Sequence, residues 1–175
     1  MNSNLKVLLI SPPIGANVRG GVSVYAKDIV DNVSNDRISI DHHFYFSDFT
    51  KFFNSSFGNL LVVKSISIFF QILIYAFKLI YRNYDFVHVN SGIASTQSLI
   101  RDGFYSIITS NVNCRCILSI HGWKERDFQN ICQSKWRLSF LSKVLKLQSL
   151  IFVSSEEQKL KLLDLGINLE NIKIT

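Results

Sequence analysis

The sequence predicts an α/β protein: a Rossmann-like parallel sheet with helices on both faces. Two observations lead to this prediction. Short apolar segments alternate with longer segments in which apolar residues recur every three or four positions. The longer segments run to roughly ten residues or more, enough for crossovers between neighbouring parallel strands. The 175 residues, 47% hydrophobic and 18% charged, suit a single domain over 1–175 and exclude a disordered chain.

The chain begins with a strand, a glycine loop and a helix. Leu5 to Ser11 is a short apolar run that ends at two prolines, which favours a buried strand. A glycine-containing loop follows, and apolar residues then recur at helical spacing from Val22 to Val33. Ile38 to Phe46 alternates well enough for a second strand, and Phe49 to Asn59 is predicted to be a loop.

The segment from Leu60 to Arg82 is the most apolar of the chain and is predicted to be one long helix. It carries a narrow polar stripe at helical spacing, made of Lys64, Ser67, Gln71, Tyr75, Lys78 and Arg82. We interpret it as a mostly buried core helix. A helix lying on a membrane surface is the alternative, because the basic residues of the stripe would suit anionic lipid. Its longest uncharged run, Ser65 to Phe77, is shorter than the roughly 18 to 20 residues that a membrane span requires.

The rest of the chain repeats the alternation. The further predicted strands are Tyr84–Val89, Cys114–Ile120, Leu150–Val153 and Asn171–Thr175, and the further helices are Ala94–Ser110, Lys135–Leu147 and Glu156–Leu165. The segment "HGWKERDF" between the fourth strand and the next helix is predicted to be a charged loop. Ser154 and Ser155 are candidate N-caps of the last helix, and Gly166 is its predicted end.

Ligands of open parallel sheets gather beyond the carboxyl ends of the strands. This rule selects four short groups, which are Gly15 to Gly21, Asn90 to Gly92, His121 to Trp123, and Ser154 with Ser155. If the fold prediction is right, all of them lie along one edge of the sheet.

The glycine loop differs from the two best-known phosphate-binding loops. "GANVRGGV" matches the G-x-x-x-x-G of a P-loop, but Gly21 and Val22 stand where Lys and Ser or Thr are needed. Its glycines are also spaced wrongly for the dinucleotide fingerprint G-x-G-x-x-G. What remains is a general device, in which Gly20 and Gly21 allow close backbone approach to a ligand at a helix N-terminus and Arg19 adds a cation. Phosphate or diphosphate is the expected ligand, and a plain tight turn is the alternative.

His121 is the candidate catalytic residue. It directly follows a strand, where an imidazole can serve a bound ligand as a hydrogen-bonding group or as an acid or base. The other histidines lie inside predicted strands, where a structural role is expected. The cysteines, Cys114, Cys116 and Cys132, show no zinc-type spacing and are interpreted as reduced core residues, so no metal site is predicted.

The charge of the chain indicates the sign of its partners. A net charge of +6 and a pI near 9.3 favour anionic partners such as phosphate groups or an acidic membrane surface. Nucleic acid is not expected, since the basic residues are dispersed and no recognition motif accompanies them. The N-terminus does not read as a signal peptide, so the prediction is a cytoplasmic protein, with the inner membrane face as an alternative place.

Four motifs together resemble the N-terminal domain of glycosyltransferases with the GT-B fold, specifically the family 4-like retaining enzymes. They are "KVLLISPP" with "GGVSVYAKDIVDNV", "YDFVHVNSG", "ILSIHGW", and "IFVSSEEQKLKLLDLGINLENIKI", in family order over nearly the whole chain. The resemblance implies that Gly20 and Gly21 approach the donor diphosphate and that His121 reaches the donor sugar from the acceptor side. The segment Asn90 to Gly92 would then border the acceptor cleft. With the strand-end rule, the predicted substrate-binding residues are Arg19, Gly20, Gly21, Asn90, Ser91, Gly92, Gly122 and Ser154.

The resemblance also implies a second domain that holds the nucleotide sugar with an E-x7-E carboxylate pair. We expect this C-terminal domain to be absent from these 175 residues, because Glu156 and Asp164 mimic the spacing only on a helix of the first domain. The chain should therefore bind an acceptor or a membrane and show little transferase activity alone, with a nucleotide sugar as substrate and no cofactor or metal required. The expected acceptor is a glycan or a lipid-linked glycan, as in surface polysaccharide or glycolipid synthesis.

Two other functions stay open. One is a stand-alone Rossmann-like module that binds a nucleotide or another anion. The other is a membrane-peripheral regulatory half that pairs with a separate catalytic chain.

Overall fold

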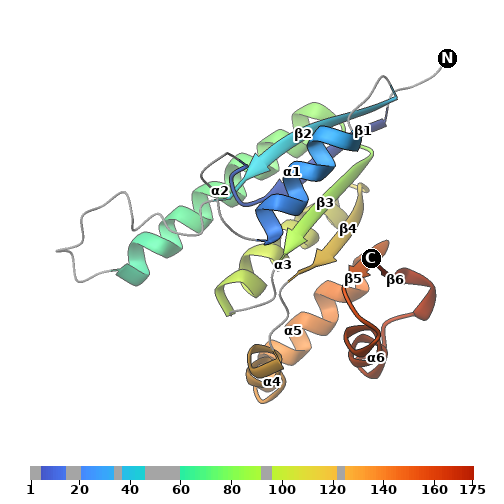
Figure 1. Ribbon diagram of the computed structural model, residues 1–175. Helices are drawn as coiled ribbons and strands as arrows, with labels where there is room; N and C mark the ends of the chain where they lie inside the picture. The colour runs from blue at the N-terminus through green and yellow to red at the C-terminus, as the bar shows by residue number, and fades with distance from the viewer. Residues whose placement is uncertain (1–4, 15–20, 34–36, 46–59, 92–95, 122–124) are drawn as a thin grey trace.

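The computed structural model describes residues 5–14, 21–33, 37–45, 60–91, 96–121 and 125–175 (Figure 1). For residues 60–65 and 97, only the backbone is described. The predicted loop 49–59 lies outside these residues.

A parallel sheet organises the part of the chain that the structure describes. Its six strands are β1 (Leu5–Ser11), β2 (Ile38–Phe44), β3 (Phe86–Ser91), β4 (Arg115–Ile120), β5 (Leu150–Val153) and β6 (Ile172–Ile174). They lie in the order β2-β1-β3-β4-β5-β6, and each neighbouring pair is parallel. The register pairs Leu9 of β1 with His88 of β3, and Asn90 of β3 with Ser119 of β4. The predicted Rossmann-like parallel sheet is confirmed.

The direction of each crossover decides which face a helix covers. The chain moves from β1 outward to β2 through α1 (Gly21–Val33), and it then moves back across the sheet for every later strand. Right-handed crossovers therefore place α1 on one face and the later helices on the other, as Figure 1 shows. The later helices are α2 (Leu60–Arg82), α3 (Thr96–Asn111), α4 (Glu125–Cys132), α5 (Lys135–Lys146) and α6 (Glu156–Asp164).

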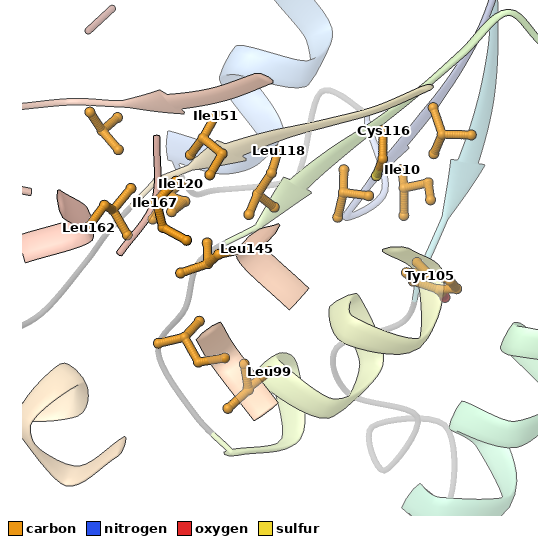
Figure 2. Close-up of a cluster of buried hydrophobic side chains, with 14 of the residues drawn as sticks. Ile10, Leu99, Tyr105, Cys116, Leu118, Ile120, Leu145, Ile151, Leu162 and Ile167 are labelled. Atoms are coloured by element: carbon orange, nitrogen blue, oxygen red, sulfur yellow. The ribbon is translucent and has the colours of Figure 1, made fainter. Parts of the chain in front are cut away.

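The core lies between the sheet and the helices opposite α1. Alternate strand residues such as Leu118, Ile120 and Ile151 are buried there against Leu145 and Leu162 (Figure 2). Cys116 belongs to the same cluster, and Cys114 and Cys132 pack against it. The three cysteines are free, as predicted.

One predicted loop is in fact partly a helix. The segment "ERDFQNIC" forms α4, whose Phe128 and Ile131 are buried three residues apart. The charged residues at the start of this segment led to the prediction of a loop. Two of them, Glu125 and Asp127, lie in the first turn of α4, where negative charge is stabilised by the positive end of the helix dipole. The end signals of α6 are confirmed: Ser155 Oγ accepts a hydrogen bond from the Gln158 amide at 3.3 Å, and Gly166 follows the helix at a φ of +75°.

Helix α2 has the predicted bounds, but its orientation corrects the prediction of a mostly buried helix. Described members of the polar stripe face the protein: Gln71 and Tyr75 are buried, and Lys78 Nζ donates to the carbonyl of His42 at 2.9 Å. Arg82 Nη1 pairs with Asp41 at 3.0 Å. These polar partners on β2 and neighbouring elements hold that side inward together with Leu79, which is buried, and most of the other large apolar residues of α2 are exposed. No helix among the described residues is long and apolar enough to cross a membrane.

Candidate functional site

The carboxyl ends of the strands share one edge of the sheet, and the described members of the predicted site lie there. Asn90 and Ser91 are the last residues of β3, so β3 ends two residues later than predicted. His121 directly follows β4, and its amide donates to the carbonyl of Ser91 at 2.8 Å, which joins the two strand ends. Gly21 is the first residue of α1, and Ser154 directly follows β5. Four other predicted residues lie outside the described ones: Arg19, Gly20, Gly92 and Gly122.

Asn90 links the end of β3 to the first turn of α1. Its Nδ2 donates to the carbonyl of Val22 at 3.0 Å, and its side chain has no solvent-exposed surface. The other half of its amide, Oδ1, has no hydrogen-bond partner among the described residues. A buried carbonyl oxygen without a partner costs about 1 to 3 kcal/mol, so this position retains an acceptor that the described fold itself does not use.

The imidazole of His121 lies under helix α1. Tyr25 of α1 covers it, with ring centroids 4.3 Å apart and planes tilted by 50°. Burial lowers the pKa of His121 below its ordinary value, so the ring is neutral near pH 7. Its Nε2 is buried and has no hydrogen-bond partner in the described part of the chain. A neutral imidazole of this kind can accept or donate one hydrogen bond to a ligand.

His88 supports this arrangement from inside β3. Its Nε2 pairs with Ser119 Oγ at 2.7 Å, and its ring meets the edge of Tyr25 at a centroid distance of 6.4 Å. Burial, with a smaller contribution from the nearby His121, lowers the pKa of His88 to about 4. The ring is therefore neutral, and the predicted structural role of this histidine agrees with its satisfied contact.

A buried ion pair fixes the same strand end from the other face of the sheet. Ser91 Oγ donates to Asp102 Oδ2, and Arg101 Nε donates to Asp102 Oδ1 at 2.7 Å. The Arg101 guanidinium also lies 3.4 Å from the centroid of the Tyr45 ring, and Tyr45 Oη donates to the carbonyl of Asn90 at 3.2 Å. These contacts hold the backbone of Asn90 and Ser91 in place.

Two further predicted residues have different local roles. A Cβ placed on Gly21 would meet no atom within 4 Å, so packing does not require glycine there and the space beside it is open. Ser154 is exposed, and its amide donates to Gln158 Oε1 at 2.9 Å as part of the cap of α6. The amide of Ser154 therefore already has a structural partner.

Tyr25, Arg101 and Asp102 were missed by the sequence reasoning. Tyr25 occupies an ordinary position in an amphipathic helix, and nothing in the pattern separates it from a core aromatic residue. Arg101 and Asp102 lie in the third predicted helix, where adjacent opposite charges suggest a solvated surface. Only the fold shows that they point to the end of β3.

This edge can interact with a ligand through hydrogen bonds and through the dipole of helix α1. The first N–H groups of a helix such as α1 have no partner within the helix itself, and its N-terminus carries about half a positive elementary charge. In the described ranges, no group of three or more His, Cys, Asp or Glu side chains is placed to hold a metal ion.

Residues of the described part of the chain also line hollows away from this edge. One, of about 410 Å³, is lined by residues such as Tyr84, Asp85 and Cys114, and the other, of about 140 Å³, includes Lys6 and Asp41. Tyr84, Asp85 and Cys114 precede β3 and β4, so the larger hollow is at the edge of the sheet where strands begin. Ligands of such sheets bind at the opposite edge, so neither hollow is the candidate site.

Comparison with known proteins adds a fold-level likeness. No protein-family model matches the sequence, and neither does any curated protein. The UDP-GlcNAc 2-epimerase of Methanocaldococcus jannaschii superposes with a TM-score of 0.61 at 14% identity, over 98% of this chain and 45% of that one. Anabaena Alr3699/HepE, solved in complex with UDP and glucose, gives a TM-score of 0.54 at 14% identity, over 98% of this chain and 44% of that one. The chain thus spans less than half the length of either structure, and the likeness shows the fold alone.

Proposed function

We propose that this chain is the acceptor-side, N-terminal half of a retaining, family 4-like glycosyltransferase, which moves a sugar from a nucleotide sugar to a glycan or lipid-linked acceptor. The observation that carries the proposal is the pair of buried polar atoms without described partners, Asn90 Oδ1 and His121 Nε2, beside the N-terminus of α1. One structural neighbour is a UDP-GlcNAc 2-epimerase, and the other was solved in complex with UDP and glucose. Both neighbours support a nucleotide sugar as the substrate class.

The arrangement suits the charges that glycosyl transfer creates. Cleavage of the anomeric bond leaves negative charge on the diphosphate and positive charge on the sugar ring. The N-terminus of α1, with Gly20, Gly21 and Arg19 of the preceding loop, would stabilise the diphosphate. The neutral ring of His121 would hydrogen-bond the donor sugar, and Asn90, with Ser91, Gly92, Gly122 and Ser154, would border the substrates along the same edge.

We expect the second wall of the cleft, which would carry the E-x7-E pair, to lie outside these 175 residues. A site that closes only when two domains meet does not exclude water from one half alone. We therefore expect the 175-residue chain to turn over UDP- or GDP-sugars far below the 1 to 1,000 per second that is roughly typical of enzymes. Turnover at ordinary enzymatic rates by the purified chain would contradict the half-site proposal.

Ligand binding separates the proposal from a general nucleotide-binding module. We expect UDP-glucose or GDP-mannose to bind with a Kd of about 1 mM in isothermal titration, and NAD and ATP to bind more weakly. His121→Ala should weaken sugar-nucleotide binding at least about tenfold, because one polar contact is lost. Asn111→Ala, at an exposed position at the far end of α3, is the matched control and should change nothing. Preference for NAD or ATP would favour the stand-alone anion-binding module.

Peripheral membrane binding belongs to the same proposal, but on a different helix from the one the sequence indicated. In α2, Lys78 and Arg82 are engaged by the carbonyl of His42 and by Asp41, whereas α5 exposes Lys135, Lys143 and Lys146 together with Trp136, which is 56% exposed. Basic residues beside an exposed tryptophan suit an anionic membrane surface on the cytoplasmic side.

Co-sedimentation with vesicles tests the membrane proposal. We expect the chain to sediment with vesicles that contain anionic lipid and to sediment less with neutral ones, and Lys143→Glu with Lys146→Glu should abolish the difference. Circular dichroism checks that α5 remains folded, since both lysines lie in its last turn. Absence of sedimentation with either kind of vesicle would remove this part of the proposal.

A further inference from the structure

The outward side of helix α2 is a continuous apolar surface, which we call the α2 stripe. Its members recur at helical spacing and are each between 38% and 77% exposed: Ile66, Phe69, Phe70, Leu73, Ile74, Phe77, Ile80 and Tyr81. Helix α2 also extends past the edge of the sheet (Figure 1). No charged residue belongs to the stripe along its length from 66 to 81.

The size of the stripe is unusual for the surface of a monomer. Large apolar and aromatic side chains each offer roughly 150 to 250 Å², so eight that are about half exposed present on the order of 1,000 Å². The largest apolar patch of a typical monomer is about 300 to 600 Å². A stable dimer of standard size buries about 800 Å² on each partner. The area of the stripe therefore matches what one copy contributes to a dimer.

The charges around the helix favour a protein partner over a lipid surface. A helix that binds an anionic membrane presents lysine and arginine next to its apolar side. Of the basic residues of α2 whose side chains the structure describes, Lys78 and Arg82 lie off the stripe: Lys78 donates to the carbonyl of His42, and Arg82, 62% exposed, pairs with Asp41. The stripe itself is uncharged, so two molecules that each carry a net charge of +6 can bring their stripes together without opposing like charges.

We propose that the chain forms a two-fold symmetric dimer in which the α2 stripe of one copy packs against the α2 stripe of the other. In a two-fold dimer the same patch serves both copies, so one self-complementary apolar surface is sufficient. Phe77 and Tyr81 stack with planes 8° apart and ring centroids 6.2 Å apart, which gives a flat aromatic surface of the kind that dominates interface energies. Because α2 lies on the face of the sheet opposite α1, dimerisation through the α2 stripe does not involve the carboxyl edge at Asn90 and His121, and the dimer is independent of the proposed function.

Analytical ultracentrifugation of the full chain tests this proposal without any variant. We expect a mass of twice the 20.0 kDa of one chain at about 10 to 100 μM, with dissociation on dilution. Phe70→Glu combined with Phe77→Glu should raise the dissociation constant at least about 100-fold, because charges then meet across the two-fold axis. Leu160→Glu is the matched control: Leu160 is exposed to 58% on α6, close to the 57% of Phe70 and the 59% of Phe77, and its substitution should leave the dimer intact. Circular dichroism verifies the fold of each variant.

Three results would overturn the proposal. The first is a chain that stays monomeric at all concentrations up to about 100 μM. Its dimer affinity would then be weaker than expected for an interface of this size. The second is a double variant that is folded and as dimeric as the unmodified chain. The third is a monomeric chain that binds phosphatidylcholine vesicles and loses this binding in the double variant, since lipid would then be the occupant of the stripe.

Discussion

His88 shows how burial sets the chemistry of single residues in this molecule. Its ring is enclosed between β3, Ser119 and Tyr25, and burial lowers its pKa to about 4. His43, buried against Tyr75 and Tyr105, has its pKa lowered to about 4 by the same cause. Between about pH 4 and 6.5, both histidines bind a proton in the unfolded chain and not in the folded one.

We therefore expect the contribution of these two histidines to the free energy of unfolding to be complete above about pH 6.5. The free energy of unfolding should fall as the pH drops from 6.5 toward 4. Each histidine contributes a slope of up to about 1.4 kcal/mol per pH unit in this window. Urea unfolding at a series of pH values measures the slope. His88→Gln, which cannot titrate, should reduce it, and an unchanged slope would show that His88 is accessible to protons in the folded chain.

The buried pair of Arg101 and Asp102 makes a second prediction at this scale. Asp102→Asn removes the charge that balances Arg101, whose side chain is 10% exposed, and weakens the contact with Ser91. We expect a loss of about 3 to 5 kcal/mol in the free energy of unfolding, measured by urea titration. Arg101→Met combined with Asp102→Asn should recover part of the loss. If Asp102→Asn costs less than about 1 kcal/mol, the pair does not act as a buried ion pair.

The sequence could identify the candidate site residues that depend on position along a strand. Asn90 and His121 follow from the rule that ligands bind at strand ends. Tyr25 could not be found in this way, because its role depends on the angle at which α1 crosses the sheet. Whether Asn90 Oδ1 has a partner likewise depends on tertiary packing, which periodicity does not report.

At the scale of elements, two glycines at helix ends should behave differently. Gly166 follows α6 at a φ of +75°, and its amide donates to the carbonyl of Leu163 at 2.8 Å. Gly166→Ala should cost about 1 kcal/mol, because a side chain disfavours this backbone conformation. Gly21→Ala meets open space and has no positive φ, so stability should change by less than about 0.5 kcal/mol.

Thermal unfolding of the two variants provides the comparison, and each glycine is the control for the other. Sugar-nucleotide binding should show the reverse order, with Gly21→Ala weakened and Gly166→Ala unaffected. Equal effects of both substitutions on binding would argue against a ligand beside the N-terminus of α1.

The existence and order of most helices and strands were predictable, but which side of a helix faces the sheet was not. Strand β1 and helix α2 have the predicted bounds because their apolar runs are long and end at clear signals. Helix α4 was missed because eight residues give barely two turns of periodicity and begin with charges. For α2, the pattern identified a polar side and an apolar side. Which side faces the body depends on the polar partners supplied by β2 and α3, which no local pattern contains.

At the scale of the whole molecule, three surfaces of different character occupy different places. The carboxyl edge of the sheet holds the buried polar groups beside α1, the α2 stripe is apolar, and α5 is basic. This division is consistent with a half-enzyme whose substrate edge is separate from its contacts with a second copy and with a membrane. The central claim is that the carboxyl edge is where a nucleotide sugar binds.

Residue-resolved NMR tests this claim most directly. The ¹⁵N-labelled chain would be titrated with UDP-glucose to about 10 mM, enough to load a site with a Kd of about 1 mM. The account predicts progressive shifts at the amides of Gly21 and His121 and at the side-chain amide of Asn90, with none at Tyr84 and Asp85 beside the hollow at the opposite edge. Shifts confined to Tyr84 and Asp85, or no shifts anywhere, would contradict it.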